Sequence, residues 1–184
     1  MTSFSIEDVG LLDEVAECVM AELLDLITMQ DIHPDDGLNE IEFSHFDLVG
    51  DLDEGVLDQL IPLSKKLTKL TLSLMDETSE ANRSALIHMS QKIFNQRPPL
   101  AHLNFYDFFA SEETAQQGEP LLHALATIMQ PTLLSLDLGL NSKLWEDETR
   151  FNLLLDVLQH QYNIEDLNLA YSDFSSVQTE QLLR

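Results

Sequence analysis

One short apolar pattern, L-x-x-L-x-L with Ile or Phe allowed at its hydrophobic positions, occurs five times along the chain. The first positions of successive occurrences are separated by 29, 33, 33 and 31 residues. A nearly constant period of this size is typical of repeat architectures, in which each unit buries its apolar face against its neighbours. The five occurrences are Leu38/Ile41/Phe43, Leu67/Leu70/Leu72, Leu100/Leu103/Phe105, Leu133/Leu136/Leu138 and Ile164/Leu167/Leu169.

Each occurrence alternates apolar and polar residues, which predicts a short strand. A polar loop and then apolar residues at three- and four-residue steps follow it, which predicts a helix at about residues 56–63, 86–94, 121–129 and 151–158. Pro98, Pro99 and Pro131 come after two of these segments and favour a return to extended chain. The pattern therefore predicts an α/β fold in which stacked units bury Leu70, Leu103, Leu136 and Leu167 as one ladder.

Residues 133–144 carry the complete signature L-x-x-L-x-L-x-x-N-x-x-L. Residues 38–184 thus resemble the leucine-rich repeat family, in its long-period subclass typified by ribonuclease inhibitor. The resemblance implies a solenoid with parallel strands on the concave side and helices on the convex side. It also implies that Asn141 hydrogen-bonds backbone groups in the turn after its strand. Met75, Phe108 and Ser172 stand at the equivalent places, so those turns must be satisfied differently.

The N-terminal segment carries a different pattern. Ser5 and Asp8 form a capping box, and apolar residues at helical spacing follow, which predicts a helix over residues 6–29 that covers the first unit. We therefore expect an N-terminal helix and linker over residues 1–37 and about five repeat units over residues 38–184. Because Arg184 ends the sequence inside a helical pattern without a cap, we expect either a fragment or a last unit that a partner covers.

The chain of 184 residues has 33 acidic and 9 basic residues, a formal net charge of -24. Residues 1–64 hold 17 of the acids and no Lys or Arg. Such a charge repels phosphate backbones and anionic headgroups, which argues against nucleic-acid and membrane binding and favours a basic protein partner. The single cysteine, Cys18, excludes an intrachain disulfide, and no signal peptide or long apolar run occurs. We expect a cytoplasmic or nuclear protein.

The outward positions of the strands are the natural binding residues of a repeat protein, because the core does not need their side chains. Tyr106 strengthens this hypothesis, since tyrosine beside polar groups is a common interface anchor. The candidates are Glu40, Glu42, Ser44, Lys69, Thr71, Ser73, His102, Asn104, Tyr106, Ser135, Asp137, Asp166, Asn168 and, bordering the row, Tyr171.

An aromatic cluster, Phe105, Tyr106, Phe108 and Phe109, follows the third strand. Phe105 belongs to the core by pattern, and we expect at least one more ring to pack under the loop. If two rings stay exposed, they form a partner-binding patch.

No catalytic or cofactor motif is found. The six histidines form no H-E-x-x-H pattern, and phosphate loops, nucleophile elbows and kinase signatures are missing, so we expect a non-enzyme without a cofactor or a metal. Residues 31–42 distantly resemble an EF-hand loop, with acids at positions 1, 5 and 12. However, Gly37 is one position late, and the segment overlaps the first strand.

The sequence favours a non-catalytic protein-binding module with two candidate surfaces, the acidic N-terminal half and the concave strand face. Two alternatives remain open. One is a regulatory protein, either GTPase-activating like another member of the same repeat class or calcium-responsive. The other is a structural subunit whose open repeat end docks into an assembly.

Overall fold

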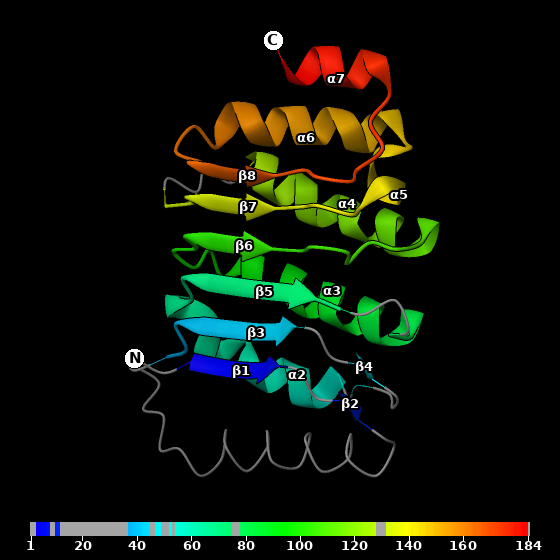
Figure 1. The fold of residues 1–184 in the computed structure, drawn as a ribbon. Helices are drawn as coiled ribbons and strands as arrows, with labels where there is room; N and C mark the ends of the chain where they lie inside the picture. The colour runs from blue at the N-terminus through cyan, green and yellow to red at the C-terminus, as the bar shows by residue number, and fades with distance from the viewer. Residues whose placement is uncertain are drawn as a thin grey trace.

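The computed structural model describes residues 3–7, 10–11, 37–44, 47–48, 52, 54–74, 78–127 and 132–183. Its main feature is a parallel sheet of six strands in the order β1-β3-β5-β6-β7-β8. These strands are β1 (Ser3–Glu7), β3 (Glu40–Ser44), β5 (Lys69–Ser73), β6 (His102–Asn104), β7 (Ser135–Asp137) and β8 (Asp166–Asn168). Figure 1 shows them stacked in chain order from the N-terminal to the C-terminal end of the molecule. The predicted α/β class with parallel strands is confirmed.

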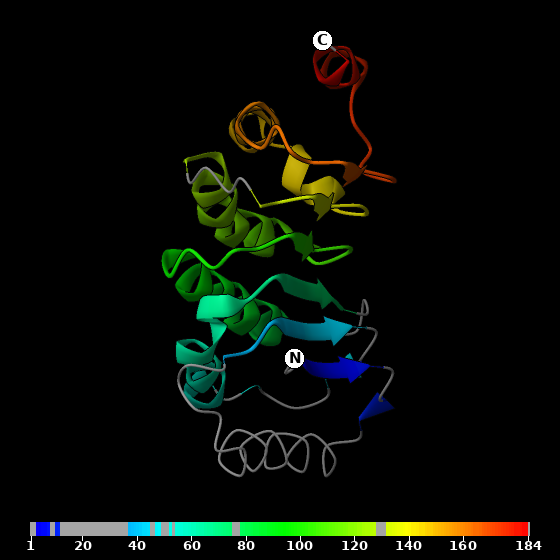
Figure 2. The ribbon, with the colours of Figure 1, turned by 90° about the vertical axis from the view of Figure 1, so that its left-hand side faces the viewer.

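The helices lie along one face of this sheet and leave the other face uncovered, as the two ribbon views show (Figures 1 and 2). Apart from the last helix, which follows β8, each lies between two successive strands, and helices are present at the predicted segments. They are α2 (Glu54–Leu60), the 3-10 helix η1 (Pro62–Lys66), α3 (Glu80–Asn95), α4 (Glu112–Thr127), α5 (Ser142–Trp145), α6 (Glu148–His160) and α7 (Ser176–Leu182). A separate parallel pair joins β2 (Gly10–Leu11) and β4 (Asp47–Leu48).

The predicted leucine ladder forms, with one difference at its end. Ile41, Leu70, Leu103, Leu136 and Leu167 are neighbours in register across five adjacent strands. The first four are at most 1% exposed, whereas Leu167 is 40% exposed. The expectation that Leu167 is buried is therefore wrong, because β8 has a neighbouring strand on one side only within the described structure.

The predicted start of the N-terminal helix is also wrong. Residues 3–7 form β1, which pairs in parallel with β3, and residues 10–11 form β2. The capping-box reading of Ser5 failed because pairing with a neighbouring strand overrides local helix propensity. The rest of the predicted helix lies outside the described residues.

Asn141 holds the turns after two strands together from a fully buried position. Its Oδ1 accepts the amides of Phe108 (3.0 Å) and Phe109 (2.8 Å). Its Nδ2 donates to the carbonyls of Phe105 (2.7 Å), Leu138 (2.9 Å) and Gly139 (3.1 Å). The predicted hydrogen bonding of Asn141 to turn backbone is thus confirmed, and three of its five partners belong to the preceding turn.

Candidate functional site

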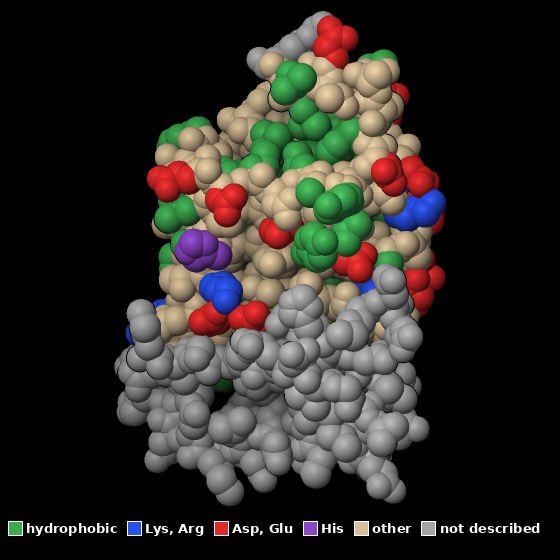
Figure 3. Space-filling model, viewed as in Figure 1, with side chains coloured by type: hydrophobic (Ala, Val, Ile, Leu, Met, Phe, Trp, Pro, Cys, Tyr) green, Lys and Arg blue, Asp and Glu red, His purple; other side chains and the backbone are tan. Residues whose placement is uncertain are grey.

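The candidate site is the strand face, the sheet face that helices leave uncovered, made of the residues that flank the ladder leucines on β3 to β8. Side chains alternate across a sheet, so residues beside a buried ladder leucine point away from the helices. Figure 3 shows acidic side chains with a histidine and a basic side chain along one part of this face, and hydrophobic side chains gathered in a separate patch. The face therefore has a polar part and an apolar part.

Three of the predicted binding residues form one ionic cluster. Lys69 Nζ lies 2.9 Å from Glu42 Oε2 and also contacts Glu40 Oε1. The strand register explains both contacts, because Glu40 on β3 lies opposite Lys69 on β5 and Glu42 lies two residues further along β3. Partial burial opposes the charge of Lys69, but the hydrogen bonds and negative charges of Glu40 and Glu42 outweigh it and raise the pKa of Lys69. The cluster carries two negative charges and one positive charge.

Three other candidates close turns at the ends of their strands. The side-chain oxygen of Asn104 accepts the amide of Tyr106 at 2.8 Å. Asp137 accepts the amide of Gly139, and Asn168 accepts that of Ala170, both at 3.0 Å. These are Asx turns, in which a short polar side chain mimics a backbone turn. This role was not predicted from the sequence, although Asn or Asp at the same register position of three strands was a readable signal.

The remaining candidates differ in exposure. Thr71 is only 5% exposed, so little of its side chain is available to a partner. Its short side chain lies between the longer Glu42 and Asn104 on the neighbouring strands. His102 and Asp166 are exposed at the beginnings of β6 and β8, and Tyr171 is 74% exposed in the turn after β8.

The apolar part of the face lies in the turns that follow β6, β7 and β8. Tyr106 packs on Gly139, where an added Cβ would lie 3.0 Å from the tyrosine ring. Leu140 and Tyr171 come one residue after the positions equivalent to Tyr106 in the next two turns, and both adopt positive φ, 56° and 58°. Backbone of this kind is unusual for large side chains. The turns therefore present Tyr106, Leu140 and Tyr171 as an apolar patch.

The three phenylalanines of the aromatic cluster do not contribute to that patch. Phe105, Phe108 and Phe109 are each at most 1% exposed, and their ring centroids lie 5.2–5.7 Å apart. A patch made of two exposed rings from this cluster is therefore ruled out, and Tyr106 is its only member that reaches the surface, half-buried. The phenylalanines are buried because Asn141 fixes their backbone beneath the turn.

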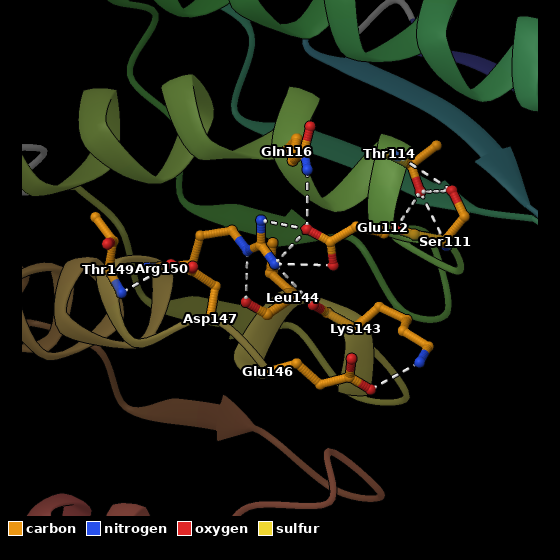
Figure 4. A network of polar contacts seen from close by, with 10 residues as sticks. All are labelled: Ser111, Glu112, Thr114, Gln116, Lys143, Leu144, Glu146, Asp147, Thr149 and Arg150. Atoms are coloured by element: carbon orange, nitrogen blue, oxygen red, sulfur yellow. Dashed lines mark hydrogen bonds and ion pairs between the residues drawn. The ribbon is translucent and has the colours of Figure 1, made fainter.

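A polar network on the helical side joins α4 to α5 and α6 (Figure 4). Arg150, only 3% exposed, donates to both carboxylate oxygens of Glu112 at 3.1 and 3.2 Å and to the Leu144 carbonyl at 3.1 Å. Hydrogen bonds from Gln116 and then Arg150 lower the pKa of Glu112. Asp147 caps α6 by accepting the amides of Thr149 and Arg150, and the Arg150 amide is the main cause of its lowered pKa. The network is structural, since it connects helices rather than lining the strand face.

Arg83 in α3 has a comparable role, and its burial was not predicted from the sequence either. It is 1% exposed, and its guanidinium donates to the carbonyls of Asp107 (2.8 Å) and Phe108 (2.9 Å) in the turn after β6. Arginine inside an amphipathic helical pattern reads as a solvent-facing residue. The sequence therefore gave no signal for either buried arginine.

A second surface feature is a cleft between α6 and α7. Aromatic and aliphatic side chains of Trp145, Phe151 and Val177 line it together with the carboxylates of Glu146, Glu148 and Asp173. No lysine or arginine is among its lining residues. The cleft thus extends the acidic character of the strand face to the C-terminal end of the molecule.

The EF-hand-like stretch lies only partly within the described residues. Among the described residues, no group of three or more His, Cys, Asp or Glu is placed to hold a metal ion. Glu42, the twelfth position of the EF-hand-like stretch, lies within β3 and contacts Lys69, and residues 31–36 lie outside the described residues. None of the described helices has both the length and the apolar composition that crossing a membrane requires.

Comparison of the chain with models of known protein families, with curated proteins and with solved structures found no match.

Proposed function

We propose that the chain is a leucine-rich repeat solenoid that acts as a non-catalytic binding module and holds a basic protein partner on its strand face. The proposal rests on the different roles of the two faces of the sheet. The helices cover one face of the sheet and bury the ladder leucines, while the other face presents side chains that the core does not use. A rigid sheet of this kind holds its outward side chains in place before a partner arrives, which lowers the entropic cost of binding.

The observation that carries the choice of partner is the charge of the strand face. Among its described residues, Glu40, Glu42, Asp137 and Asp166 are acidic and only Lys69 is basic. Lys69 is already held by Glu40 and Glu42. An excess of negative charge steers a basic partner to the face and speeds its encounter.

The apolar patch of Tyr106, Leu140 and Tyr171 supplies the second half of the proposed mechanism. Tyrosines at the centre of an interface often contribute much of its binding energy, because they bury a large area at a small cost in side-chain entropy. The charges therefore determine mainly how fast the partner binds, and the patch determines mainly how slowly it leaves. The acidic residues 1–64 are a second surface for the same kind of partner. A cytoplasmic or nuclear location fits this role.

A matched pair of charge variants tests the proposal. Glu40→Gln/Glu42→Gln removes two negative charges from the strand face, and Glu119→Gln/Asp156→Asn removes two from the helical side. Partners captured from cell extract and identified by mass spectrometry are purified and measured by surface plasmon resonance. We expect the first variant to lower the association rate of a basic partner several-fold at low salt, with less effect at high salt.

The second variant should leave that rate unchanged. Cross-linking of the purified complex then locates the contacts. Equal effects of the two variants, or cross-links that avoid both the strand face and residues 1–64, would contradict the proposed function.

A further inference from the structure

Lys69 is the only lysine or arginine among the described outward positions of β3 to β8. Its role differs from that of its polar neighbours on the strand face. Asn104 and Asp137 close turns through their side chains. The ammonium group of Lys69 instead bonds Glu40 and Glu42 and no other described residue. The two glutamates alone therefore hold this side chain in place.

Glu40 and Glu42, which we call the carboxylate pair, form a binding site for an ammonium group. They are two residues apart on β3, so their side chains leave the same face of the sheet about 6–7 Å apart. Two negative charges at this separation repel each other. Lys69 Nζ removes the repulsion by donating to Glu42 Oε2 at 2.9 Å and to Glu40 Oε1. The chain thus shows in its own structure how the carboxylate pair binds a cation.

The ammonium group of Lys69 can be exchanged for another one. The side chains of Lys69, Glu40 and Glu42 are 37%, 31% and 15% exposed, and Figure 3 shows acidic side chains beside a basic one on this face. Ion pairs that are open to water contribute little to stability. The lysine side chain is flexible and can turn into solvent without disturbing the ladder, because Leu70 beside it is buried on the helical side.

We propose that the carboxylate pair is the subsite of the strand face that takes a lysine side chain of the basic partner, and that Lys69 occupies this subsite until the partner displaces it. The inference rests on the proposed function and names the residues that receive the partner's charge. Lys69 is then an internal competitor. A ligand that offers one ammonium group alone gains little, because it replaces an equal group. A partner that also covers the apolar patch is held, so the competition favours selectivity.

Removal of the competitor tests the proposal. The probe is a short acetylated peptide in which Lys and Val alternate, and its affinity is measured by isothermal titration calorimetry at low salt. Lys69→Gln removes the internal ammonium group. Lys92→Gln is the matched control, because it removes one positive charge from an ion pair with Asp58 on the helical side, where the lysine is 44% exposed. We expect Lys69→Gln to tighten binding about fivefold and Lys92→Gln to change it less than about twofold.

A double-mutant cycle separates competition from a general change in charge. Glu40→Gln/Glu42→Gln removes the subsite, and we expect it to weaken binding of the Lys peptide. In a protein that carries this double substitution, Lys69→Gln should have no further effect, because no carboxylate pair is left to compete for. A long-range effect of charge would be of the same size in both backgrounds.

The ammonium signal of Lys69 in the unaltered chain gives a direct readout by NMR, which also decides if a variant does not fold. We expect the Lys peptide to move this signal toward that of a lysine in water. A peptide in which Glu and Val alternate should leave it in place.

Three results would overturn this inference and leave the proposed function standing. They are a gain from Lys69→Gln no larger than that from Lys92→Gln, an equal gain with and without the carboxylate pair, and an unmoved Lys69 signal in a chain that binds the Lys peptide on its strand face. A chain whose strand face binds neither the Lys peptide nor a captured basic partner would overturn the proposed function as well.

Discussion

Leu136 and Leu167 occupy the same place in two neighbouring strands, yet the first is fully buried and the second is 40% exposed. The residues around them follow the same sequence pattern. What differs is the number of neighbours, since in the part of the chain that the structure describes β7 lies between two strands and β8 beside one. A leucine in a stacked parallel sheet is stabilised by the neighbouring strands as well as by its own, so the same sequence pattern contributes less stability where one neighbour is missing.

The turns after these strands differ in the same way. Asn141 makes five hydrogen bonds in the turn after β7. Ser172 takes the equivalent place after β8, is 2% exposed, and its Oγ has no hydrogen-bond partner among the described residues. A serine side chain is too short to reach the preceding turn as Asn141 does. Among the described residues, the turn after β8 thus lacks the buried side-chain hydrogen bonds that Asn141 makes between the turns after β6 and β7.

Asn141→Ala should lower the stability of the fold most, because it removes the hydrogen bonds that distinguish the turn after β7 from the turn after β8. It leaves the amides of Phe108 and Phe109 and three carbonyls without their buried partner, and each unsatisfied group costs about 1–3 kcal/mol. Because some groups will find water or shift, we expect a loss of about 4 kcal/mol in the free energy of unfolding, measured by urea denaturation.

Asn168→Ala is its control in the end unit. It removes one exposed hydrogen bond, to the Ala170 amide, and we expect a loss of at most about 1 kcal/mol. Similar losses in the two variants would show that the turns of the middle and end units are equally important.

The ladder leucines provide a second test of the same comparison. Leu136→Ala creates a cavity in a closed core and should cost about 3 kcal/mol, whereas Leu167→Ala should cost about 1 kcal/mol, because that side chain is already partly in water. Urea denaturation of both variants gives the two values. A larger loss for Leu167 would mean that the end of the ladder is as well packed as its middle.

Much of this fold was predictable from the sequence because its strongest signal is a repeat. Five leucine triplets at a nearly constant period predicted stacked parallel strands with the ladder leucines side by side, and the resemblance to the leucine-rich repeat family implied the role of Asn141. Local capping residues predicted secondary structure less reliably than this pattern did. The Ser5 capping box predicted a helix where β1 forms, because a pairing between β1 and β3 some 37 residues apart decides the structure there.

The candidate site was predicted less well, because outward position alone does not define function. Period-two alternation placed Lys69, Asn104 and Asp137 on the strand face, but their partners come from register and turn geometry. Asn104 and Asp137 close turns, and Thr71 is covered by its longer neighbours. Contacts between strands about 30 residues apart therefore decide which outward residues are available to a partner.

Gly118→Ala tests how tightly the middle of the molecule is packed on its helical side. Gly118 lies in α4, where an added Cβ would be 2.4 Å from the buried ring of Phe109. Alanine usually stabilises a helix relative to glycine by about 1 kcal/mol, but here the clash should reverse the sign and cost about 2 kcal/mol. Thermal unfolding followed by circular dichroism measures the change.

Gly55→Ala is the matched control, because Gly55 is an exposed residue of α2. We expect that variant to lose no stability. A stabilising effect of Gly118→Ala would show that the Phe109 ring moves freely under α4, and that the middle of the molecule is packed less tightly than its burial indicates.

The smallest effect concerns the ionic cluster of β3 and β5. Because Glu40 and Glu42 raise the pKa of Lys69 above 10.5 in the folded protein, the cluster stabilises the fold fully below pH 10.5. That contribution is lost as the pH rises through the folded-state pKa. The cluster is partly exposed, so its contribution is at most about 1 kcal/mol.

Lys69→Met should therefore be less stable than the unaltered chain at about pH 9, and urea denaturation across the alkaline range should show that this difference in the free energy of unfolding decreases as the pH rises. The repulsion between the two glutamates is present in both proteins once Lys69 is neutral, which is why the gap reports the lysine charge alone. A gap that stays constant up to about pH 12 would show that Lys69 stabilises the strands through its aliphatic chain, and that the negative charge of Glu40 and Glu42 is open to a partner.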